Sequence, residues 1–127
     1  MILTYEQIVS IAQGVAYGTN HWKGSTPERL RMLCEGFYDK LVANYPNAKI
    51  LALTPIWRKD CTDITQFESF EEIEEIIADI VKKYDNVTCI SGRNFVPEDE
   101  TLFSDLYLHP NDAGFKYYSE GVKKMLC

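Results

Sequence analysis

Two short, continuously apolar segments set between helical patterns constrain the fold of this chain most. One is AKILALTP, from Ala48 to Pro55, and the other is VTCISG, from Val87 to Gly92. Such a segment, without alternating polar residues, is typical of a strand that is buried on both faces. Strands that alternate with helices along a chain predict a parallel sheet with helices on both faces. The sequence therefore predicts an α/β fold.

Three other segments carry the apolar spacing of amphipathic helices. The first starts at a Ser or Thr cap and ends before Pro46, the second covers residues 69–84, and the third opens on Pro110. The expected buried stripes are Leu30, Leu33, Phe37 and Leu41 in the first helix, Phe70, Ile73, Ile76, Ile77, Ile80 and Tyr84 in the second, and Phe115, Tyr118, Val122 and Met125 in the third.

The beginning of the chain is less regular than the rest. Residues 1–15 predict a short, atypical N-terminal helix, and the segment VAYG, which ends at Gly18, predicts a strand that enters a turn at Asn20. The length of 127 residues fits one domain, so we expect residues 1–127 to form a single α/β domain.

Composition excludes several classes of function. The net charge of −6 disfavours binding to nucleic acid, because an acidic surface repels phosphate groups. No segment is long and apolar enough to predict a membrane span, and the N-terminus does not match a signal peptide. The four cysteines are not spaced as metal ligands, which favours reduced thiols in the cytoplasm. We expect no cofactor and no metal.

Polar residues follow the expected strands and converge on one edge of the sheet, where functional groups of α/β proteins gather. Asn20, the loop from Thr54 to Arg58, the segment 92–94 and His109 all belong to this edge. His109 precedes the last helix with Asp105 nearby, an arrangement that suits a general base oriented by a carboxylate. The alternative is that His109 is only a helix-entry residue before its proline.

Two motifs on this edge resemble blocks of a known enzyme family. GTN at Asn20 and HPNDAGF at His109 resemble the asparagine and histidine blocks of the SGNH hydrolases, or GDSL-like lipases and esterases. The resemblance covers residues 16–127. It implies a flavodoxin-like three-layer α/β/α sandwich, a Ser-His-Asp mechanism with His109 as base and Asp105 as its acid, and Asn20 as a donor to the oxyanion. A turn-forming role for Asn20 is the alternative.

The chain departs from the family pattern at the acid and beside the asparagine. The family usually places its aspartate three residues before the histidine, but Leu106 stands there, so a one-residue bulge is needed for Asp105 to reach His109. Asp112 is the alternative acid, although its position suits a partner of the helix dipole. His21 replaces an acid that often follows the asparagine in the family. We expect His21 to lie at the surface or at the rim of the site.

The family's nucleophilic serine block is absent from the sequence. Ser91, at a strand end, is the least unsuitable substitute. We therefore expect a chain that is truncated on its N-terminal side and inactive alone. Loss of the first strands would expose a sheet edge, which predicts a homo-oligomer that pairs through that edge.

The resemblance implies that the parent protein hydrolyses a carboxylic ester, with a carbohydrate O-acetyl group as the candidate substrate. Trp22, Trp57 and Arg58 are candidate residues of the substrate mouth. The alternative function is a non-catalytic binding or assembly module on the same scaffold. A nucleotide or phosphate binder is weaker, because no glycine-rich loop opens a helix.

Overall fold

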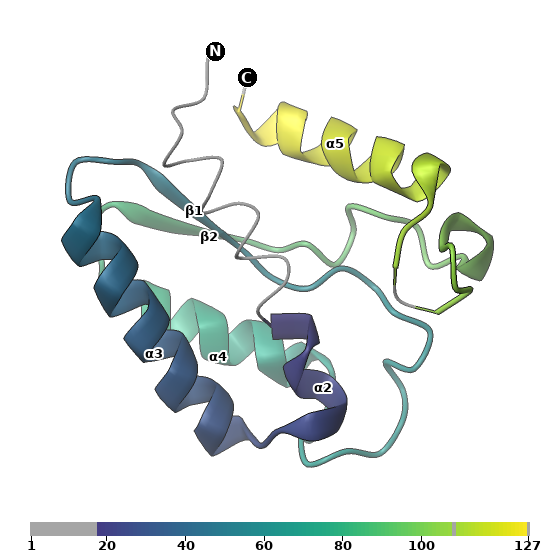
Figure 1. The fold of residues 1–127 in the computed structure, drawn as a ribbon, viewed down its shortest axis with the longest axis horizontal. Coiled ribbons are helices and arrows are strands. Elements are labelled where there is room, and N and C mark those ends of the chain that lie inside the picture. The colour runs from purple at the N-terminus through teal and green to yellow at the C-terminus, as the bar shows by residue number, and fades with distance from the viewer. Residues whose placement is uncertain (1–17, 108, 127) are drawn as a thin grey trace.

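The computed structural model describes residues 18–107 and 109–126, and it mixes helices with a small parallel sheet (Figure 1). The predicted α/β class is therefore confirmed. The expected helix over residues 1–15 lies outside the described residues. The elements are α2 (His21–Gly24), α3 (Pro27–Asn44), β1 (Ile50–Leu53), α4 (Glu71–Val81), β2 (Val87–Ile90), the 3-10 helix η1 (Glu100–Leu102) and α5 (Asp112–Leu126).

The two predicted apolar segments form β1 and β2, which pair in parallel with Ile50 opposite Val87. The pairing continues past the last strand residues, because the Thr54 N–H donates to the Ile90 carbonyl at 3.1 Å. The Thr54 hydroxyl also accepts from the Gly92 N–H at 2.9 Å. These bonds hold together the loops that leave the carboxyl ends of both strands.

Alternate residues of β1 face two different hydrophobic clusters, as a pleated strand requires. Ile50 and Ala52 pack in the cluster that contains α3 and α4, whereas Leu51 and Leu53 pack with the cluster reached by α5. All four residues are buried. Helices therefore lie on both faces of the sheet, α3 and α4 on one and α5 on the other (Figure 1).

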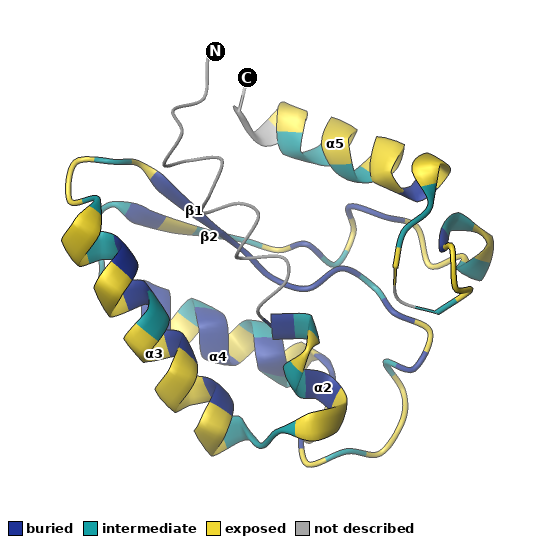
Figure 2. Cartoon of the chain, viewed as in Figure 1, coloured by how far each residue is buried: buried dark blue, intermediate teal, exposed yellow. Residues whose placement is uncertain are grey.

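Helix α3 begins as predicted but buries a slightly different stripe. The Thr26 hydroxyl caps it by accepting from the Arg29 N–H at 3.2 Å. Leu33, expected inside, is 37% exposed. Cys34, the next residue in the chain, is fully buried in its place, because the face toward α4 is centred one residue later than the leucine spacing indicates. The buried residues of α3 are Leu30, Cys34, Tyr38 and Leu41 (Figure 2).

Helix α4 follows the predicted stripe closely, with Ile73, Ile76, Ile77 and Ile80 buried and Tyr84, just beyond the helix, half-buried. The acidic residues of its first turn complement the helix dipole. The Glu72 carboxylate in this turn accepts from the Glu68 N–H at 3.0 Å.

Helix α5 covers the second face of the sheet with a narrow stripe. Tyr118 and Val122 are half-buried and pack on that cluster, but Phe115 is 56% exposed, so its predicted burial is wrong. Gly114, not Phe115, faces the segment that contains Leu102. A Cβ at Gly114 would lie 2.3 Å from the Leu102 carbonyl oxygen. The glycine of HPNDAGF is thus required by close backbone approach.

The segment before α2 differs from the expected strand. Gly18 and Thr19 are helical, and Asn20 has right-handed helical angles; residues 15–17 of the expected strand lie outside the described residues. Gly18 packs against the sheet layer so tightly that a Cβ would lie 2.8 Å from the Pro55 ring. This close contact holds the residue two positions before Asn20 against the loop that follows β1.

Two cysteines pack in the cluster that contains α3 and α4. Cys34 is fully buried and Cys89 half-buried against the same cluster. Desolvation raises the pKa of the Cys34 thiol to about 12 and that of Cys89 to about 11. Both thiols therefore stay protonated near neutral pH and are poor nucleophiles.

Leu30 and Leu33 lie on the buried and the exposed side of α3. The same Leu→Ala substitution is therefore expected to change the free energy of unfolding by different amounts at the two positions. Leu30 is fully buried, so Leu30→Ala is expected to lower the free energy of unfolding by about 2–5 kcal/mol. Leu33→Ala, on the exposed side, is the matched control and is expected to cost less than about 1 kcal/mol. Urea denaturation measures both values, and equal losses would contradict the assigned face.

Candidate active site

The loop that carries His109 is closed at its base by backbone hydrogen bonds. Phe103 and Pro110 form an antiparallel bridge, and the Ser104 N–H donates to the His109 carbonyl at 2.7 Å. The Asn111 N–H donates to the Leu102 carbonyl at 2.9 Å, next to the bridge. The main chain on both sides of the imidazole is therefore fixed by local bonds.

Asp105 organises the interior of this loop. One carboxylate oxygen accepts from the Tyr107 N–H at 2.9 Å and from the His109 N–H at 3.2 Å. The other lies 2.7 Å from the His109 Nδ1. Leu106 has a φ of 58°, in the left-handed region that non-glycine residues rarely adopt. With this left-handed residue directly after it, Asp105 contacts the ring of His109, four residues later in the chain.

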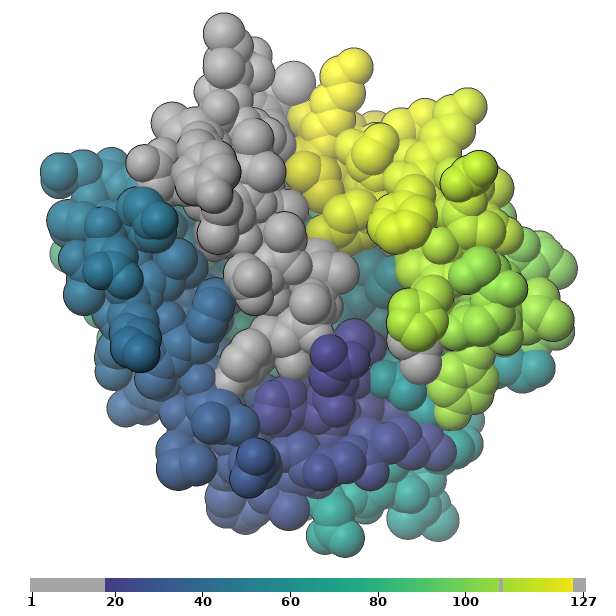
Figure 3. All heavy atoms as spheres, in the orientation of Figure 1, coloured from purple at the N-terminus to yellow at the C-terminus, as the bar shows by residue number. Residues whose placement is uncertain are grey.

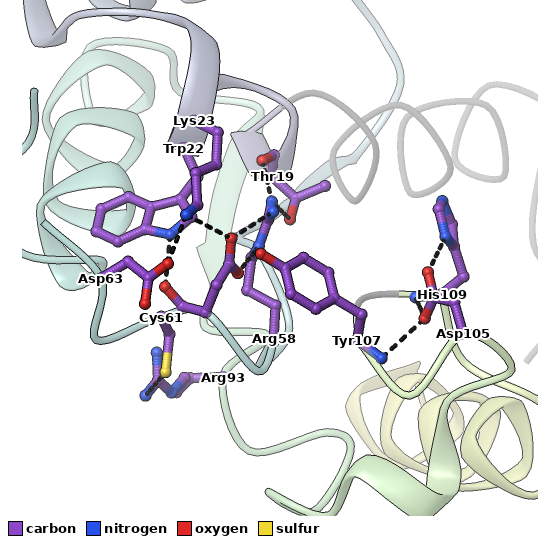
Figure 4. Close-up of polar contacts among 11 residues, drawn as sticks. Thr19, Trp22, Lys23, Arg58, Cys61, Asp63, Arg93, Asp105, Tyr107 and His109 are labelled. Atoms are coloured by element: carbon purple, nitrogen blue, oxygen red, sulfur yellow. Dashed lines mark hydrogen bonds and ion pairs between the residues drawn. The ribbon is translucent and has the colours of Figure 1, made fainter. Parts of the chain in front are cut away.

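The geometry indicates which nitrogen of His109 carries the proton. An ionised carboxylate only accepts hydrogen bonds, so the Nδ1–H donates to Asp105, and in the neutral form of the ring the Nε2 then carries the lone pair. The His109 side chain is 72% exposed. The imidazole is thus oriented by a carboxylate and open to solvent, as a general base requires (Figure 4).

A buried ion pair lies beside this loop. Arg58 and Asp60 are 5% and 4% exposed, and two guanidinium nitrogens of Arg58 donate to the two oxygens of Asp60, one of them at 3.0 Å. Burial alone raises the pKa of Asp60, but hydrogen bonds from Arg58 and Tyr107 and the charges of Arg58 and Lys23 outweigh it and leave that pKa below its ordinary value.

The same pair joins the two segments that sequence analysis singled out. The Arg58 Nη1 donates to the Thr19 carbonyl at 2.7 Å, and the guanidinium lies 5.8 Å from the centre of the Tyr107 ring. Figure 4 shows Tyr107 between Arg58 and the Asp105–His109 pair. In Figure 3 the purple atoms that begin at Gly18 and the green atoms of the segment before α5 are both visible on the face turned toward the viewer. Arg58 thus contacts both Thr19, the residue before Asn20, and Tyr107, which belongs to the loop of His109.

Asn20 itself is exposed, and its side chain makes no capping hydrogen bond to α2. Its carboxamide is therefore not used as a helix cap. His21 is half-buried, and burial, followed by the charge of Arg29, lowers its pKa. Asp112 is exposed in the first turn of α5, and the carboxylate that bonds to His109 is Asp105.

The three candidate mouth residues serve mainly as packing. Trp22 is 1% exposed, packs on Phe67 and Phe70, and donates from its indole to the Asp60 carbonyl at 2.9 Å. Trp57 is half-buried against Phe103. With Arg58 in the buried pair, Trp57 is the one candidate that retains exposed surface.

Sequence reasoning missed Asp60 and Tyr107. The short Arg-x-Asp spacing of Arg58 and Asp60 was a usable signal, since opposite charges two residues apart in a loop can pair. Nothing local indicated Tyr107, whose hydroxyl bonds to Asp60 from a distant part of the chain.

The described serines have other roles or no contact with the imidazole. The Ser91 hydroxyl donates to a Glu74 carboxylate oxygen at 3.1 Å, and the Ser104 hydroxyl donates to the His109 carbonyl at 3.1 Å. Within residues 18–107 and 109–126, no serine hydroxyl bonds to the His109 ring. A nucleophile is therefore not assigned to this part of the chain.

In the part of the chain that the structure describes, no helix is long and apolar enough to cross a membrane, and no group of three or more acidic, His or Cys side chains is placed to hold a metal ion. No protein-family model, curated protein or solved structure matches the chain.

The buried pair predicts unequal effects for two neighbouring aspartates. Asp60→Asn removes the charge that compensates the buried Arg58, and we expect it to lower the free energy of unfolding by about 3–5 kcal/mol. Asp63 pairs with Lys23 at the surface, so Asp63→Asn, the matched control, is expected to cost less than about 1 kcal/mol. Chemical denaturation at pH 7 measures both.

The same comparison has a defined dependence on pH. Because the pKa of Asp60 is lowered in the folded state, its contribution is complete above the unfolded value of about 3.9 and is lost as pH falls through the folded value. The stability difference between wild type and Asp60→Asn is expected to be constant from about pH 5 to 7 and to shrink below about pH 4. A difference that grows on acidification would contradict the assignment.

Proposed function

We propose that this chain is a member of the SGNH hydrolase family, built on a flavodoxin-like α/β/α sandwich, and that its site serves hydrolysis of a carboxylic ester. The observation that carries the proposal is the 2.7 Å contact between Asp105 and the Nδ1 of an exposed His109. Helices on both faces of a parallel sheet support the proposed sandwich.

In this function the Nε2 of His109 accepts the proton of the attacking hydroxyl. Asp105 keeps the ring in the required tautomer and stabilises the imidazolium that forms. General-base catalysis of this kind contributes about 10²–10⁴ in rate. The exposed amide of Asn20 donates to the carbonyl oxygen as negative charge develops there, and one such donor contributes about 10²–10³.

The identity of the nucleophile determines the rate of ester hydrolysis by this chain alone. With water in place of a serine, the Asp105–His109 pair acts only as a general base, and no acyl-enzyme forms. The chain alone is therefore expected to be inactive as a Ser-His-Asp enzyme, and the turnover left to its general base is slow and confined to activated esters. An acetyl group on a carbohydrate remains the proposed physiological class of substrate.

The alternative proposal is a non-catalytic binding or assembly module on the same scaffold. The observation that favours it is that no described serine bonds to the His109 ring. The two proposals make opposite predictions for turnover.

Hydrolysis of p-nitrophenyl acetate by the purified chain separates the two functions. We expect a rate above that of free imidazole at equal concentration, and at least a tenfold loss in His109→Ala and in Asp105→Ala, because each removes the oriented base. His21→Ala is the matched control, and its rate should equal that of wild type. A rate no higher than free imidazole, or an unchanged rate in His109→Ala, would reject the hydrolase and favour the module.

We also propose that the protein assembles with a second copy through a sheet edge. Among the described strands, β2 pairs only with β1, and Thr88 on β2 is exposed. A strand with one unpaired edge favours pairing with another chain. Light scattering at micromolar concentration is expected to give the mass of a dimer or larger species, and a folded monomer would contradict the proposal.

A further inference from the structure

We propose that Arg58 is a positioning residue of this site, which holds the turn carrying Asn20 and the loop carrying His109 in a fixed relation. The inference rests on the proposed function, because it concerns the same amide donor and the same base. It assigns to Arg58 a role in geometry rather than contact with a substrate.

The bonds of Arg58 support this role. Its Nε and Nη2 donate to the two oxygens of Asp60, and its Nη1 donates to the Thr19 carbonyl at 2.7 Å. The Thr19 hydroxyl lies 3.4 Å from the same nitrogen. At 5% exposure, the guanidinium is enclosed by these partners. The residue is therefore committed to the protein itself.

The loop of His109 is tied to the same segment in three ways. The Lys59 N–H donates to the Tyr107 carbonyl at 2.9 Å, the Tyr107 ring lies 5.8 Å from the Arg58 guanidinium carbon, and the Tyr107 hydroxyl bonds to Asp60. The Tyr107 N–H also donates to Asp105. Tyr107 therefore connects the Arg58–Asp60 pair to Asp105, the carboxylate that orients His109 (Figure 4).

An arginine is specifically suited to this place. Its planar fork satisfies a carboxylate with two nitrogens while the third nitrogen reaches a backbone carbonyl, and its flat face packs on an aromatic ring. A lysine keeps the positive charge but cannot form these contacts together. Since misplacement of a catalytic group by about 1 Å can cost about 10² in rate, the loss of the fork matters to chemistry.

The experiment compares Arg58→Lys with Lys59→Ala in the full chain. Lys59 is adjacent, and its exposed side chain pairs with Glu100, so its variant keeps the backbone bond to Tyr107. Amide hydrogen exchange and ¹⁵N NMR report on the site without any substrate. In Arg58→Lys we expect at least tenfold faster exchange at Tyr107 and His109 and shifted Asn20 side-chain amide signals. Exchange at Ile77 in α4 should change less than twofold.

Lys59→Ala is expected to leave all of these signals as in wild type. If Arg58→Lys does not fold, Tyr107→Phe replaces it, because this variant keeps the ring and removes only the hydroxyl bond to Asp60. For Tyr107→Phe we expect faster exchange at His109, by at least threefold, and a smaller fraction of the Nδ1–H tautomer of that ring. A folded variant with unchanged Asn20 and His109 signals overturns the inference.

Ester turnover distinguishes failure of this inference from failure of the proposed function. No turnover in wild type, together with the expected NMR changes, rejects the hydrolase and leaves the positioning role standing. Turnover that depends on His109 but is unchanged in folded Arg58→Lys rejects the positioning role alone.

Discussion

The buried ion pair of Arg58 and Asp60 is the interaction on which the arrangement of this edge depends. Two charges withdrawn from water are costly unless nearly every polar atom finds a partner. Here the requirement is met by groups from separate parts of the chain, the Thr19 carbonyl, the Tyr107 hydroxyl and the ammonium of Lys23. One buried pair thus connects α2, through Lys23 and the preceding Thr19, to the loop before α5, through Tyr107.

Much of the fold could be predicted from local pattern. The strands were visible because both lie in continuous apolar segments, and α4 because its isoleucines recur at helical spacing. Errors arose where the packing partner, rather than the pattern, decides burial. Leu33 and Phe115 fit an apolar stripe, but the sheet and its neighbouring loop contact Cys34 and Gly114 instead. Such a shift by one residue depends on tertiary contacts that a single sequence does not display.

The candidate site divides in the same way. Asp105 and His109 are four residues apart, so their contact follows from one loop and was accessible to sequence reasoning. The role of Arg58 was not, because Thr19 is 39 residues away from it along the chain. An arginine beside a tryptophan suggested a binding surface. Only the fold shows that the guanidinium nitrogens of Arg58 donate to groups inside the protein. Trp22 was misjudged for the same reason, since aromatic residues in loops give no sign of the core they fill.

The left-handed backbone at Leu106 has a consequence for how histidine–carboxylate pairs are recognised. The loop is anchored at its base and contains one residue with left-handed torsions, and an aspartate four positions before the histidine reaches the ring nitrogen. A search profile that scores the acid at a single offset before the histidine would pass over this loop. In this loop the contact depends on the hydrogen-bonded base rather than on one fixed spacing. A search that allows several spacings between the acid and the histidine is therefore the better criterion.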